Sequence, residues 1–125
     1  MNNQSNRPLS PHLTIHKRFQ TAILSIAHRI TGFGLNIGTI LLVLWLMFLA
    51  IGESYFQIIY SLSNTLLIKI ILFFWTFGLF FHLVNGIRYL FWSSGYGMNI
   101  KSLNLSGYLV IVFSLILTIL VWTVN

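Results

Sequence analysis

Residues 66–92 read LLIKIILFFWTFGLFFHLVNGIRYLFW, and this stretch decides the fold. About 20 apolar residues, at a rise of 1.5 Å each, form a helix that crosses a hydrocarbon core of roughly 30 Å. Backbone polar groups in lipid must be paired within the segment, so the stretch predicts a helix and not a strand. His82, Asn85 and Arg88 are costly to place there, and such residues indicate a working site.

Two further apolar runs have the length of a membrane span, at residues 22–51 and 105–124. Glycine and small polar residues separate the runs, and we expect residues 52–64 and 93–97 to form loops. The sequence therefore predicts an all-α membrane protein with three transmembrane helices at 22–51, 66–92 and 105–124. This transmembrane domain, residues 20–125, would follow an N-terminal arm formed by residues 1–19.

The composition limits both the solvent of this protein and its chemistry. Of its 125 residues, 57% are hydrophobic and only 6% are charged, too few to cover a water-soluble surface, so we expect a lipid bilayer to surround it. The net charge of +6 comes from scattered cations that form no basic face, so we expect no nucleic-acid partner. The absence of cysteine excludes disulfides, iron–sulfur ligation and covalent haem attachment. With a single acid, Glu53, catalysis by this chain alone is not expected.

Cations collect on one side of the predicted spans. Residues 52–64 contain none, whereas Arg7, Lys17 and Arg18 precede the first span, Arg29 lies near its start, and Arg88 and Lys101 flank the second loop. Lys69 is the exception, and its long side chain can reach the opposite interface. Loops rich in lysine and arginine stay on the cytoplasmic side, or on its organellar equivalent, the matrix. We therefore expect the N-terminus and the second loop on that side.

His82 shares a predicted helical face with Gly78, Gly86 and Tyr89. Glycines one turn on either side of an imidazole leave a gap that suits a flat macrocycle, whose iron the histidine nitrogen would bind. The alternative is a histidine that is hydrogen-bonded to a neighbouring helix, with the glycines allowing close packing. Spacing alone leaves both interpretations open. If His82 binds haem iron, the other axial ligand must come from elsewhere.

Ser25, His28 and Arg29 are spaced i, i+3 and i+4, and so project from one face of the first predicted helix. A hydroxyl and a fixed cation at the membrane boundary can hold a quinone carbonyl and stabilise negative charge on it. The alternative is that these residues only anchor the helix end among the headgroups.

Three blocks of the sequence resemble the succinate dehydrogenase cytochrome b subunit family. The blocks are RPLSPHLTI at residues 7–15, SIAHRITG at 25–32 and HLVNGIR at 82–88. The resemblance implies a membrane anchor that forms half of a haem-binding bundle with a second anchor subunit. It further implies a flavoprotein subunit that oxidises succinate and an iron–sulfur subunit that passes electrons to ubiquinone. The location implied is the mitochondrial inner membrane or the bacterial cytoplasmic membrane, crossed several times.

The resemblance also assigns roles to individual residues. His82 matches the axial iron ligand of a haem b, the metal site of this chain, and the partner anchor would supply the second ligand. Ser25 and Arg29 match the ubiquinone site, and His28 and Arg29 match positions near the haem propionates. The sequence departs from the family pattern at Tyr89, where a second histidine is usual.

Three further departures lie outside the matched roles. Ser93 stands where an aspartate is usual, and His16 and Arg18 stand where a tyrosine and a proline are usual. Two alternatives to the anchor of succinate dehydrogenase stay open. One is the anchor of a quinol:fumarate reductase, which runs the same electron path backwards, and the other is a structural membrane subunit without a cofactor.

Overall fold

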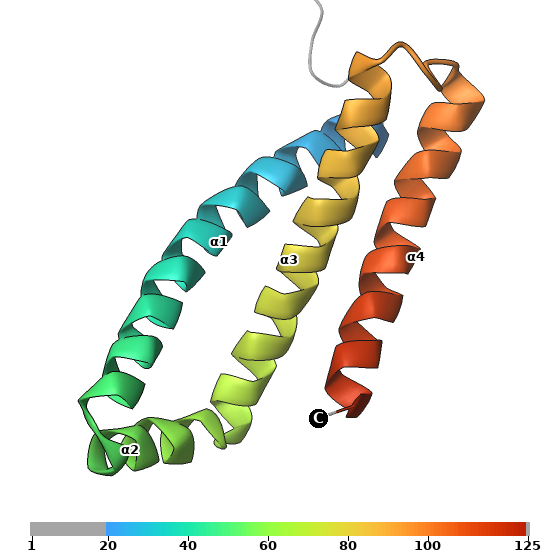
Figure 1. Ribbon diagram of the computed structural model, residues 1–125. Coiled ribbons are helices and arrows are strands. Elements are labelled where there is room, and N and C mark those ends of the chain that lie inside the picture. Colours follow the sequence, from blue (N-terminus) through green and yellow to red (C-terminus); the bar gives the residue numbers. More distant parts are fainter. Residues whose placement is uncertain (1–19, 125) are drawn as a thin grey trace, which may run out of the picture.

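The computed structural model describes residues 20–124, which form four helices and no strand. They are α1 (Gln20–Ile51), α2 (Glu53–Ser63), α3 (Leu66–Ser93) and α4 (Ile100–Val124). Helices α1, α3 and α4 are each long and apolar enough to cross a membrane (Figure 1). The expected all-α architecture with three membrane spans is therefore confirmed. The expected N-terminal arm, with Arg7, Lys17 and Arg18, lies outside the described residues.

The prediction that residues 52–64 form a loop is wrong, because most of them belong to α2. Ser54, Gln57 and Ser61 make a polar stripe along this helix, and Phe56 and Ile59 are partly buried on another side. This spacing is that of an amphipathic helix, and turn-forming residues at both of its ends obscured it in the sequence. Figure 1 shows α2 running across the ends of the spans, where a helix with one polar stripe meets both water and lipid.

Short connections join the helices. Gly52, between α1 and α2, has φ 148° and ψ 166°, a backbone conformation that is essentially restricted to glycine. Helix α4 begins five residues before the expected start of its span, because Asn99 caps it: the Asn99 Oδ1 accepts a hydrogen bond of 2.7 Å from the Ser102 amide.

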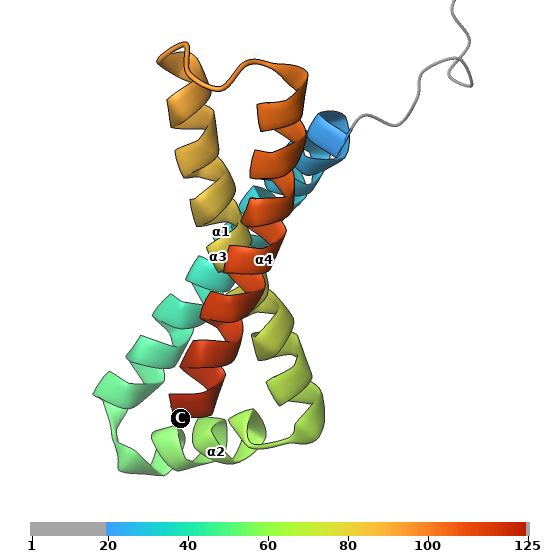
Figure 2. The same ribbon diagram turned by 90° about the vertical axis from the view of Figure 1, so that its right-hand side faces the viewer.

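Helices α1 and α3 lie close together near the start of α1 and diverge toward α2 (Figure 1). At Gly38 the two helices are still in contact. The Trp75 indole of α3 packs so closely on Gly38 that a Cβ at this position would collide with it. Helix α4 packs on α3, and the two helices cross when seen from the side (Figure 2). The start of α1 and the connection between α3 and α4 lie at one end of the bundle, and α2 and the C-terminus lie at the other.

The described chain has a small core of its own. Leu24, Phe81 and Val110 are its buried apolar side chains, one from each long helix. On α4 the small residues Ser114 and Thr118 are also buried, and their hydroxyls donate to carbonyls of the same helix. Many large apolar side chains stay exposed along the spans, as expected of a protein surrounded by lipid or by other membrane helices.

Candidate functional site

His82 lies where α3 crosses α1, and its ring is fixed by hydrogen bonding to α1. Its Nδ1 is 3.1 Å from the backbone carbonyl oxygen of His28 and 3.3 Å from the Thr31 hydroxyl. A carbonyl oxygen only accepts hydrogen bonds, so Nδ1 must carry the hydrogen. In a neutral imidazole the lone pair then belongs to Nε2, which makes no hydrogen bond within residues 20–124. This is the arrangement that a histidine uses to bind a metal through Nε2.

The His28 ring stacks on the His82 ring. The ring centroids are 3.8 Å apart and the planes differ by 7°. Tyr89 packs edge-on against the His28 ring, with the ring centroids 5.3 Å apart. Stacking covers a face of the His82 ring, whereas a metal approaches a nitrogen in the plane of the ring. The stacked His28 ring therefore does not occupy the in-plane position from which a metal would bind Nε2.

Glycines on both helices allow this close approach. A Cβ on Gly32 would lie 2.9 Å from the Cε1 of His82 and 3.8 Å from its Nε2. A Cβ on Gly78 would meet the Thr31 side chain at 3.7 Å, and one on Gly86 would meet the His28 ring at 3.8 Å. Gly78 and Gly86 therefore face side chains of α1, as in the packing alternative, whereas the gap expected for a macrocycle is filled there. Gly32, on the facing helix, allows α1 to approach the Cε1 edge of the His82 ring.

Ser25 and Arg29 lie on the same part of α1 as His28, as the helical spacing predicts. Ser25 is half-buried and Arg29 is exposed. Neither side chain makes a hydrogen bond or an ion pair with the described part of the chain. The structure thus brings His28 and His82 together and leaves Ser25 and Arg29 free for groups outside residues 20–124.

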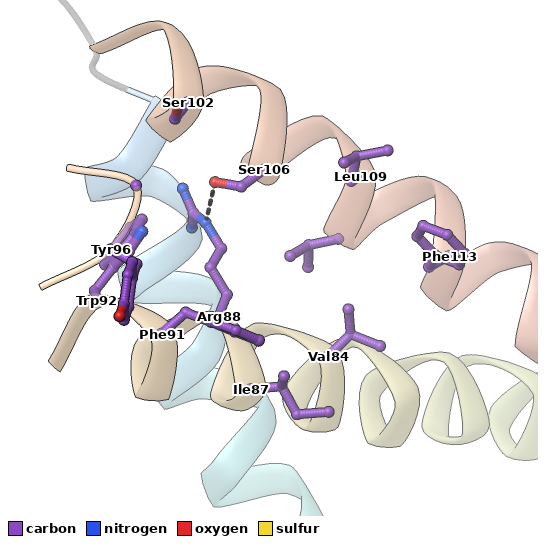
Figure 3. Close-up of a pocket in the computed structure, with 12 residues that line it drawn as sticks. Val84, Ile87, Arg88, Phe91, Trp92, Tyr96, Ser102, Ser106, Leu109 and Phe113 are labelled. Carbon is purple, nitrogen blue, oxygen red and sulfur yellow. Dashed lines mark hydrogen bonds between the residues drawn. The ribbon is translucent and has the colours of Figure 1, made fainter. Parts of the chain in front are cut away.

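A second polar cluster surrounds Arg88, which is buried between α3 and α4. Its Nε donates to the Ser106 hydroxyl at 2.9 Å, its Nη2 to the Leu103 carbonyl at 2.8 Å and its Nη1 to the Asn85 Oδ1 at 3.2 Å. The guanidinium also lies 4.0 Å from the centre of the Trp92 ring. Figure 3 shows the Arg88 side chain reaching across to Ser106. This cluster joins α3 to α4.

Comparison with known proteins identifies the relatives of this three-span bundle. Residues 3–121 match the family described as succinate dehydrogenase/fumarate reductase transmembrane subunit. The chain belongs to this family. The resemblance drawn from the three sequence blocks is therefore confirmed, and the chain is a membrane anchor of the succinate dehydrogenase cytochrome b type.

Bacterial and mitochondrial members of the family are similar over most of their length. The succinate dehydrogenase cytochrome b556 subunit of Rickettsia prowazekii is 43% identical over 94% of this chain and 92% of its own. The cytochrome b560 subunit of Reclinomonas americana is 36% identical over 99% of this chain and 90% of its own. The mitochondrial cytochrome b560 subunit of Mus musculus is 41% identical over 92% of this chain and 69% of its own.

For this succinate dehydrogenase anchor, sequence patterns singled out the two histidines but not the groups that orient them. Thr31 and the carbonyl of residue 28 fix the His82 ring, and a backbone carbonyl leaves no trace in a sequence. The partners of Arg88 were also missed. Ser106, a polar residue near the start of an apolar span, was the available signal.

Proposed function

We propose that this succinate dehydrogenase anchor binds a b-type haem through His82 and forms part of a ubiquinone reduction site with Ser25 and Arg29. Its partners would be a second membrane anchor, an iron–sulfur subunit and a flavoprotein subunit. The observation that carries the proposal is the Nδ1–carbonyl hydrogen bond of His82, because it leaves the lone pair of Nε2 available. The cytochrome names of the relatives support the same cofactor.

When bound, haem b would supply a one-electron redox centre inside the membrane. His82 would offer its Nε2 to the iron, and Gly32 allows α1 to approach the Cε1 edge of the His82 ring. The buried His28 Nδ1 has no hydrogen-bond partner within residues 20–124. The role of His28 beside the haem propionates rests on the sequence resemblance and on its contact with the His82 ring.

Arg29 and Ser25 would act together at the quinone. The Ser25 hydroxyl donates a hydrogen bond to one quinone carbonyl, and the exposed Arg29 guanidinium offsets negative charge on the reduced ring and on the propionates. Both side chains lie about one turn or less from His28 on α1. One stretch of helix therefore serves the quinone and the edge of the haem.

The physiological direction of turnover is either succinate oxidation or fumarate reduction. The description of the family covers fumarate reductases as well. The rickettsial and mitochondrial relatives carry the name of succinate dehydrogenase, which supports succinate oxidation as the physiological direction.

We also propose that the start of α1 faces the matrix or the bacterial cytoplasm. The start of α1 and the connection between α3 and α4 lie at the same end of the bundle, as three antiparallel spans require. The chain has no cysteine, so single cysteines placed at Ser94 and at Gln57 can be labelled with a membrane-impermeant maleimide. In inside-out vesicles we expect labelling at position 94 only, and labelling at position 57 alone would reverse the orientation.

His82→Ala tests the haem proposal in the assembled complex. We expect the reduced-minus-oxidised spectrum to lose its low-spin b-type bands, because alanine offers no nitrogen to the iron. Leu83→Ala is the matched control, since Leu83 is the next residue on α3 and is exposed. An unchanged spectrum in the His82→Ala complex would refute the assignment.

A further inference from the structure

Arg88 is a buried cation that has no acidic partner within residues 20–124. Only 5% of its surface is exposed, and its three hydrogen bonds go to uncharged oxygens. The single acid of the sequence, Glu53, begins α2 at the opposite end of the bundle. Burying an unpaired charge near hydrocarbon is costly. The guanidinium has five N–H donors, of which three are used, so two can still bind an anion.

Arg88 also lines a cavity between α3 and α4. The cavity has a volume of about 330 Å³. At the end near the connection between the helices its lining includes polar groups, from Trp92, Tyr96, Ser102 and Ser106 (Figure 3). Phe91 lies beside these residues, and farther from this end the walls are apolar and are formed by Val84, Ile87, Leu109, Val110 and Phe113. The surface of the cavity is thus almost wholly apolar, with the cation of Arg88 near the end that meets the connection between α3 and α4.

The dimensions of the cavity match its position in a membrane. Ser102 and Phe113 both line it, and 11 residues of helix separate them, which corresponds to about 16 Å along the axis of α4. Arg88 lies five residues before the end of α3, or roughly 8 Å from that end. A headgroup at the membrane surface is therefore within reach of the guanidinium, and an acyl chain can follow the apolar walls inward.

We infer that this cavity binds one phospholipid with an anionic headgroup, whose phosphate pairs with Arg88 and whose acyl chain lies between α3 and α4. Charge complementarity favours this occupant, since the cation lacks an acid and a phosphate takes the free donors of an arginine well. Basic pockets between membrane helices are typical sites for such headgroups. The inference requires neither haem nor quinone and stands apart from the function proposed above.

The test uses the assembled complex, tagged on this chain and extracted in a mild detergent. The complex is exposed to equal amounts of dioleoylphosphatidylglycerol and dioleoylphosphatidylcholine, and bound lipid is counted by native mass spectrometry. We expect one phosphatidylglycerol to be retained in preference to phosphatidylcholine. In Arg88→Gln the preference should fall about fivefold, the effect of one cation near a headgroup.

A second variant keeps the test valid if Arg88→Gln fails to assemble. Leu109→Trp fills the cavity from α4 and leaves every hydrogen-bond partner of Arg88 in place, so it should lose the bound lipid. Leu120→Trp is the matched control, because Leu120 lies on the same helix, is exposed and does not line the cavity. Equal retention of the two lipids by the unmodified complex would overturn the inference, as would equal lipid content in Leu109→Trp and Leu120→Trp. If a carboxylate of a partner subunit pairs with Arg88 in the complex, the unmodified complex would retain the two lipids equally.

Discussion

The imidazole rings of His28 and His82 lie parallel, 3.8 Å apart, and the backbone carbonyl of His28 also accepts a hydrogen bond from the His82 ring. Residue 28 therefore acts on His82 in two separable ways. Its side chain covers one face of the ring, and its main chain fixes which ring nitrogen carries the hydrogen. The second contribution is independent of the identity of the side chain.

His28→Ala separates these two contributions. The variant removes the stacked ring but keeps the carbonyl that orients His82, so we expect haem to be retained at a reduced level and with a shifted potential. His82→Ala should lose the haem altogether. Haem content per complex and a redox titration of the b-type bands measure the difference. Equal loss in both variants would mean that the His28 side chain, and not its carbonyl, holds the site together.

Gly32→Ala should disturb the axial histidine without removing it. The new methyl group would lie 2.9 Å from the Cε1 of His82, closer than carbon atoms pack, so the ring or α1 must move. We expect a lower haem content and broadened b-type bands. Gly34→Ala is the control, because a Cβ there meets nothing within 4 Å. If Gly32→Ala binds haem as well as Gly34→Ala does, α1 does not pack on His82 in the complex.

Arg29→Ala should slow quinone reduction and leave succinate oxidation intact. Its exposed guanidinium makes no hydrogen bond or ion pair within residues 20–124, so the loss should act on a bound group and not on the fold. We expect a fall in activity of about a hundredfold with ubiquinone, the order of effect of one charge-stabilising group. Activity with a water-soluble electron acceptor should be unchanged. A normal rate with ubiquinone would exclude Arg29 from the site.

Gly38→Ala tests the contact between α1 and α3 midway along the spans. The added methyl group would collide with the Trp75 indole, and overpacking of this kind costs roughly 1–3 kcal/mol. We expect a lower melting temperature of the purified complex. The double variant Gly38→Ala/Trp75→Phe should recover much of the loss, because phenylalanine is smaller. Without such recovery the indole would not be the cause of the destabilisation.

Ser106→Ala measures one bond of the Arg88 cluster. It removes the acceptor for the Nε of Arg88 and leaves the other two acceptors in place. We expect a loss of stability of about 0.6 kcal/mol, the average for a hydrogen bond between membrane helices. Ser93→Ala is the control, since Ser93 is exposed and bonds only within α3. Comparison of the unfolding midpoints of the two variants in detergent shows whether the hydrogen bond between α3 and α4 contributes to stability.

The sequence by itself determined the three spans and the residues that stand out within them. Hydropathy and the need to pair backbone groups in lipid are local properties, so residues 22–51 and 66–92 could be predicted to within two residues of α1 and α3. His82 was conspicuous because an imidazole is costly in an apolar run. The helical spacing likewise placed Ser25, His28 and Arg29 on one part of α1.

Only the tertiary structure decided which atoms meet between helices. The choice of Nε2 as the free nitrogen of His82 depends on a backbone carbonyl of α1, and the burial of Arg88 depends on hydroxyl and carbonyl oxygens of α4. The sequence also placed Gly78 and Gly86 beside an open gap, whereas α1 fills that space. The crossing angle and rotation of packed helices set such contacts, and residue spacing along one helix does not specify either quantity.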